Sequence, residues 1–115
     1  MKSFLFLIMT DPRTSGRPAE AVRIAAGVGV WKKVEVTVYL RDAAVLLLSE
    51  ETDGLVDGEN CGRYLPILRE SGRPVYVEKG APLLSGGAPA TVPVKEISDM
   101  ELAALAAARD HVLRF

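Results

Sequence analysis

Short apolar runs alternate with helical patterns along the whole chain. Residues 4–9 are continuously apolar, which is typical of a strand that helices cover on both faces. Residues 34–40 carry apolar side chains in both phases of the alternation, so they also belong inside a sheet. The other predicted strands are residues 74–77, 92–97 and 110–115. The strand over residues 92–97 contains Pro93, which has no amide hydrogen for a ladder bond, so we expect it at an edge of the sheet.

Helical segments separate these strands. The first is predicted over residues 18–31, with Pro18 in its first turn. Its inward face consists of small residues that let a helix lie close to a sheet: Ala19, Val22, Ala25, Ala26 and Gly29. The last helix starts after Ser98, where the Ser-Asp-Met-Glu sequence predicts a capping box. A short helical segment also opens at Pro82.

Pro66 limits the helix in the middle of the chain. Proline is tolerated in a first turn and costly deeper in, so we predict that this helix starts at residues 62–64 and ends near residue 71. Cys61 then lies at or just before its N-terminus. Residues 50–60 are acidic and contain glycine, and we expect a mobile loop there. The apolar residues 43–48 before that loop are a candidate surface for contact with another subunit.

The alternation of strands and helices predicts the α/β class. We expect a three-layer α/β/α arrangement around a mostly parallel five-stranded sheet. The 115 residues suffice for one domain, residues 1–115, and not for two.

Composition narrows the classes of function. The formal net charge of −1 with scattered basic residues gives no reason to expect a nucleic-acid partner. No apolar stretch is long enough for a membrane helix, and the single cysteine fits a reducing compartment, so we expect a cytoplasmic protein. With one histidine, at position 111, and one cysteine, we expect neither a metal site nor a cofactor.

Polar residues follow the first three predicted strands and should converge at the carboxyl edge of the sheet, where open parallel sheets bind ligands. After the first strand, hydroxyl groups and a guanidinium precede the N-terminus of a helix, and such an arrangement suits the binding of an anion. A loop that only caps its helix is at least as good an interpretation. The candidate ligand-binding residues are Thr10, Arg13, Thr14, Ser15, Arg41, Asp42, Lys79 and Gly80.

Two residues are candidates for catalysis. Glu78 ends the third strand and is a general acid or base if its surroundings raise its pKa; a solvated carboxylate is the alternative. Cys61, near a helix N-terminus and Arg63, has features that stabilise a thiolate, although a lone cysteine is more often a small buried hydrophobic residue.

The chain resembles the DsrE/DsrF-like (TusD/YchN-like) sulfur-relay family over nearly its full length. The resemblance rests on the first strand, loop and Ala-rich helix (residues 4–27), on Tyr-Leu-Arg-Asp-Ala-Ala-Val (residues 39–45), on Gly-Arg-Pro-Val-Tyr-Val (residues 72–77) and on the ending over residues 102–115. In relay members, a cysteine just after the third strand carries a persulfide. That position falls at or next to Glu78 here, and a carboxylate cannot hold a persulfide.

The resemblance implies an oligomer, a trimer or hexamer of one chain or of paralogous subunits, with sulfur-relay proteins as partners. Our first hypothesis is a divergent member that binds a small ligand or a partner protein without the persulfide cysteine. The alternatives are a sulfur carrier that uses Cys61, and an enzyme that uses Glu78 with Arg13 or Asp42 on a small anionic substrate.

Overall fold

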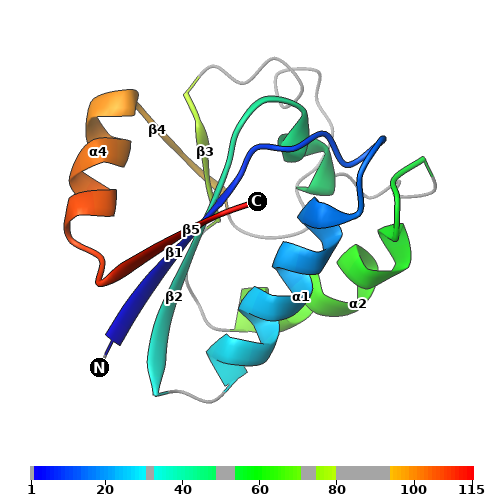
Figure 1. Ribbon diagram of the computed structural model, residues 1–115, viewed down its shortest axis with the longest axis horizontal. Coiled ribbons are helices and arrows are strands. Elements are labelled where there is room, and N and C mark those ends of the chain that lie inside the picture. The colour runs from blue at the N-terminus through cyan, green and yellow to red at the C-terminus, as the bar shows by residue number, and fades with distance from the viewer. Residues whose placement is uncertain (1, 31–32, 49–53, 71–74, 80–93) are drawn as a thin grey trace.

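A five-stranded parallel sheet forms the centre of the molecule, with helices on both faces (Figure 1). This computed structural model describes residues 2–30, 33–48, 54–70, 75–79 and 94–115. The strands lie in the order β4-β3-β2-β1-β5. Their bounds are β1 Lys2–Ile8, β2 Val34–Leu40, β3 Val75–Glu78, β4 Val94–Ile97 and β5 His111–Arg114. The predicted α/β class and five-stranded sheet are confirmed.

The helices cover the two faces unequally. Helices α1 (Arg17–Val30) and α2 (Gly58–Glu70) pack on one face, and α4 (Asp99–Ala107) packs on the other (Figure 1). A 3₁₀ helix, η1 (Asp42–Leu48), follows β2. The helical segment predicted to open at Pro82 lies outside the described residues.

Two apolar clusters fill the spaces between the layers. On the α1 and α2 face, the core includes Phe6, Ile8, Val38 and Val77, and it receives the small face of α1 as predicted. On the α4 face, Leu5, Tyr39 and Ile97 are buried beneath Leu102 and Leu105. Alternate residues of a strand point to opposite faces of the sheet, and helices cover both faces here. Apolar side chains are therefore needed at every position of β1, which explains its continuous apolar run.

The start of α2 differs from the prediction. The helix begins at Gly58, so residues 58–60 are helical rather than part of a loop, and Cys61 lies inside the first turn rather than before it. Asp57, whose φ is 55°, turns the chain, and its carbonyl accepts a hydrogen bond from the Asn60 amide. Pro66 is consequently inside the helix, where burial of Leu65 and Leu68 offsets the lost hydrogen bond.

The apolar segment over residues 43–48 is already part of the core of its own chain. Within η1, Ala44 and Leu47 are 0% exposed, and Val45 and Leu48 are also buried. The prediction that this segment supplies a contact surface for another subunit is therefore wrong. Its apolar character comes from packing against α1 and the sheet.

Candidate functional site at the carboxyl edge of the sheet

Arg41, the residue after β2, lies at the centre of a polar cluster. Its Nε donates a hydrogen bond to the Tyr39 hydroxyl oxygen at 3.2 Å and lies 3.4 Å from Oε2 of Glu78. Its Nη2 pairs with the carboxylate of Asp99, the first residue of α4. We call Tyr39, Arg41, Glu78 and Asp99 the Arg41 cluster. It joins β2, β3 and the start of α4 through one guanidinium.

The sheet register places these residues together. Tyr39 is opposite Tyr76 in the β2–β3 pair, so β2 and β3 end side by side at the same edge. The Arg41 amide donates to the Ile8 carbonyl at 3.1 Å, which fixes the backbone just beyond β2. Beyond β3, the Lys79 amide donates to the Ile97 carbonyl at 3.0 Å. The predicted meeting of the second and third strand ends is confirmed.

The capping box of α4 positions Asp99. The Ser98 hydroxyl accepts a hydrogen bond from the Glu101 amide, and the Glu101 carboxylate accepts one from the Ser98 amide, as the sequence pattern predicts. The helix therefore starts directly after β4 and presents Asp99 at the same edge as Arg41.

Burial determines the charge states in the Arg41 cluster. Tyr39 is 0% exposed, and this burial raises the pKa of its hydroxyl, although the hydrogen bond from Arg41 acts in the opposite direction. The hydrogen bond to Tyr39 raises the pKa of Arg41, while burial acts in the opposite direction. The cluster therefore holds a neutral phenol and a permanently charged guanidinium between two carboxyl groups.

The cluster also lies where the chain connections change sides. The connection after β2 leads to α2 on one face, whereas the connection after β4 leads to α4 on the opposite face (Figure 1). In open parallel sheets, ligands bind outside the carboxyl ends of the strands, and the Arg41 cluster lies outside the ends of β2 and β3.

The loop after β1 uses its polar groups within itself. Arg13 forms an ion pair with Asp11 at 2.9 Å, and this contact lowers the pKa of Asp11 below its usual range. The Thr14 hydroxyl donates to the Asp11 carbonyl at 3.4 Å, and the Ser15 hydroxyl accepts from the Arg17 amide at 3.2 Å. Ser15 thus caps the start of α1, and Thr10 is half-buried between β1 and this loop.

An acidic residue from the start of α2 approaches this loop. A Cβ placed on Gly16 would lie 2.8 Å from Oδ2 of Asp57, and the Val56 amide donates to the Pro12 carbonyl at 2.8 Å. The N-terminus of α1 is therefore already beside a carboxylate of its own chain. The anion site predicted here from the sequence stays a prediction.

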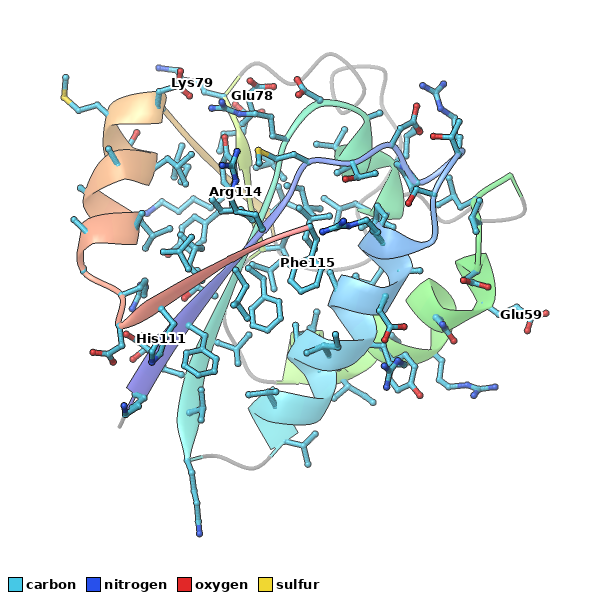
Figure 2. All side chains as sticks on the ribbon, in the orientation of Figure 1. Glu59, Glu78, Lys79, His111, Arg114 and Phe115 are labelled. Carbon is cyan, nitrogen blue, oxygen red and sulfur yellow. The ribbon has the colours of Figure 1, made fainter. Side chains whose placement is uncertain are left out.

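The remaining candidates are spread around the edge. Asp42 is exposed at the start of η1 with a φ of 55°, and Lys79 is exposed beyond β3. Gly80 lies outside the described residues, as does the side chain of Cys61. His111 lies at the opposite end of the sheet from Glu78, next to Phe4 at the start of β1 (Figure 2).

Two members of the Arg41 cluster were missed by sequence reasoning. Tyr39 was assigned only as a strand residue, although a buried tyrosine hydroxyl needs a hydrogen-bond partner and Arg41 is two residues away. Asp99 was assigned only to the capping box, although it follows a strand whose end reaches the same edge. Among the described residues, no group of three or more histidine, cysteine or acidic side chains is arranged to hold a metal ion.

Comparison with solved structures identifies the fold. The crystal structure of the YchN protein from E. coli matches with a TM-score of 0.82 and 22% sequence identity, over 100% of both chains. The chain has the YchN fold. The fold implied by the resemblance to DsrE/DsrF-like proteins is therefore confirmed. No family model and no curated protein sequence matches this chain. No helix among the described residues is long and apolar enough to span a membrane.

Proposed function

We propose that this protein is a non-relay subunit with a DsrE-like fold. It assembles with copies of itself or with paralogous chains in the cytoplasm, and the Arg41 cluster binds a small ligand or a partner protein without carrying sulfur. The observation that supports this proposal most is the side chain at the end of β3. The resemblance puts the cysteine of relay proteins at or next to Glu78, where this chain has no cysteine, and the Glu78 carboxylate lies 3.4 Å from Arg41 Nε.

The chemistry of that contact favours binding over sulfur transfer. A persulfide needs a sulfur nucleophile, and a carboxylate has none. The Glu78 carboxylate is instead paired with the Arg41 guanidinium. Arg41 is 26% exposed and Glu78 is 31% exposed, so both remain accessible to a molecule that docks at this edge.

A sulfur-loading experiment tests the proposal. The protein and its Cys61→Ser variant are incubated with a cysteine desulfurase and cysteine, and protein-bound sulfane sulfur is measured by intact mass. We expect neither protein to gain the mass of a sulfur atom. Loading of the parent that disappears in Cys61→Ser would instead establish the alternative in which Cys61 is a carrier.

Assembly and catalysis have separate tests. Light scattering coupled to size exclusion should give a mass that is a multiple of the 12.4 kDa chain. A strictly monomeric protein at high concentration contradicts the subunit role. In the enzymatic alternative, Glu78 acts on a small anion, and Glu78→Gln would abolish turnover of that anion. We expect the parent protein itself to show no turnover.

A further inference from the structure

Arg41 has more hydrogen-bond donors than its partners use. A guanidinium carries five N–H groups. In the described part of the chain, Nε contacts the Tyr39 hydroxyl and Glu78, and Nη2 contacts Asp99, while Nη1 makes no hydrogen bond or ion pair. The Arg41 side chain is 26% exposed, so its unused donors can meet a molecule from solution.

The buried phenol of Tyr39 holds this guanidinium in place. Its hydroxyl oxygen accepts from Arg41 Nε at 3.2 Å, and the guanidinium carbon lies 5.7 Å from the centre of the Tyr39 ring. Because Tyr39 is 0% exposed and packs in one cluster with Leu5 and Ile97, the ring has little room to move. The donors of Arg41 are therefore fixed on the face of the sheet that α4 covers, which lowers the entropic cost of binding a ligand there.

Arg114 at the end of β5 places a second guanidinium on the same face. Leu7 lies opposite Tyr39 on one side and opposite Arg114 on the other, so all three residues share the α4 face. Neighbouring strands are about 4.8 Å apart, which puts the Cα atoms of Arg114 and Tyr39 about 10 Å apart. Arg114 is exposed, and no carboxylate among the described residues pairs with its guanidinium. Figure 2 shows the Arg114 side chain toward the end of the sheet that carries Glu78.

Asp99 is the most exposed partner of Arg41. Its side chain is 83% exposed, and an ion pair so open to water contributes little to stability because solvent screens it. An anion from solution can therefore replace the Asp99 carboxylate on Nη2 at small cost. Both carboxylates of the Arg41 cluster already have Arg41 as a partner, whereas the unused polar groups are N–H donors. This arrangement favours an acceptor ligand over a cation.

We propose that Arg41 and Arg114 together bind a small oxyanion, and that the Asp99 carboxylate occupies the Arg41 part of this site when the ligand is absent. The oxyanion takes Nη2 from Asp99 and also accepts from Nη1, which gives the bidentate geometry that guanidinium groups form with carboxylate and phosphate. Arg114 adds a second positive charge from β5. The inference rests on the ligand-binding role proposed above and names the class of ligand.

The charges around the site are compatible with an anion. Once Asp99 has moved into water, the two guanidinium groups face one carboxylate of the cluster, that of Glu78 on Arg41 Nε. These three groups leave a net positive charge for the ligand. Asp99 itself stays in the first turn of α4, where a negative charge is favourable, so its release from Arg41 does not disturb the helix. Because the site is partly exposed, we expect a dissociation constant on the order of 1 mM for a simple inorganic anion.

Heteronuclear NMR titration with sodium sulfate tests this site, with sodium chloride used to hold the ionic strength constant. We expect saturable shifts of the Arg41 and Asp99 amide resonances in the parent. Arg41→Met should weaken binding about tenfold or more, because it removes charge-assisted hydrogen bonds, and Arg114→Met should weaken it about threefold or more. Asp99→Asn should tighten binding roughly two- to fivefold, because it removes the competing carboxylate.

Two control variants make similar changes elsewhere. Glu96→Gln removes an exposed carboxylate on the opposite face of β4, and Arg13→Met removes an arginine that pairs with Asp11 in the loop after β1. We expect both to bind sulfate as the parent does. Sodium acetate, titrated in the same way, shows whether a carboxylate group suffices or a tetrahedral group is needed. Saturable binding of either anion that depends on Arg41 supports the site.

Each outcome is decisive when circular dichroism shows that the variants are folded. Shifts that do not saturate with either anion, or that survive Arg41→Met, overturn the oxyanion site, and so does binding that Arg13→Met removes. Equal affinities of the parent, Asp99→Asn and Glu96→Gln overturn the role of Asp99, and an unchanged affinity of Arg114→Met overturns that of Arg114. None of these results affects the proposed non-relay role. Sulfur loading of the parent would overturn that role without altering the sulfate titration.

Discussion

Replacing Arg41 with methionine tests whether the Arg41 cluster stabilises the fold. The variant leaves the Tyr39 hydroxyl without its donor, in a side chain that is 0% exposed, and such a loss costs about 1–3 kcal/mol. The contact with Glu78, at 31% exposure, adds about 0.2–1 kcal/mol, and the pair with the 83% exposed Asp99 adds little. We therefore expect a total loss of about 1–4 kcal/mol.

Urea unfolding followed by circular dichroism measures this loss. Arg13→Met is the matched control, because Arg13 makes an ion pair with Asp11 in an exposed loop, and we expect its urea midpoint to match that of the parent. Tyr39→Phe removes the hydroxyl, so Arg41→Met should cost clearly less in that background. An unchanged midpoint for Arg41→Met, or full additivity of the two changes, would refute the reasoning.

Three further changes test other parts of the structure. Ser98→Ala removes the capping box of α4 and should lower the free energy of unfolding by about 1 kcal/mol in urea; no change means that the cap is unimportant. Pro66→Ala supplies a backbone amide inside α2, so it should raise the free energy of unfolding by roughly 1–2 kcal/mol and raise the thermal midpoint. A lower midpoint contradicts the helical assignment of residue 66. Asp110 has a lowered pKa in the folded state, so its stabilising effect is present above its ordinary pKa of 3.8 and is lost as pH falls through the folded value. Asp110→Asn should therefore flatten the acid side of the stability–pH curve, and an unchanged acid slope excludes this role.

Strong local patterns made most of the fold predictable from the sequence. In residues 34–40, apolar side chains point to both faces of the strand, which predicted that β2 lies inside the sheet. The observed bounds of β2 are the predicted ones. The capping box before Asp99 located α4. Pro93 indicated an edge strand, and β4 is at an edge.

Errors arose where tertiary packing outweighed a local rule. Pro66 was assumed to mark a first turn, but burial of Leu65 and Leu68 against the core keeps it inside α2. The apolar residues of η1 were interpreted as an intermolecular surface, whereas they fill the core of their own chain. An apolar segment indicates burial, and the sequence does not say by which chain.

The candidate site was predicted in part. The carboxyl ends of parallel strands lie at the same edge of a sheet, so the predicted topology was enough to expect Arg41 and Glu78 at one edge. Their direct contact depends on side-chain reach, and the participation of Asp99 depends on α4 starting directly after β4. Neither distance can be obtained from residue types and spacing.

Introducing a cysteine at the end of β3 tests the central claim most directly. In a Cys61→Ser background, Glu78→Cys places a thiol beside Arg41, whose charge favours the thiolate, and Lys79→Cys provides an exposed thiol one residue away. After treatment with a cysteine desulfurase and cysteine, we expect a sulfur atom on the Glu78→Cys protein, and on neither the Lys79→Cys protein nor the parent with Cys61 intact. A parent that takes up sulfur as readily as the Glu78→Cys protein would contradict the claim that this chain has the fold of a sulfur relay without the relay activity.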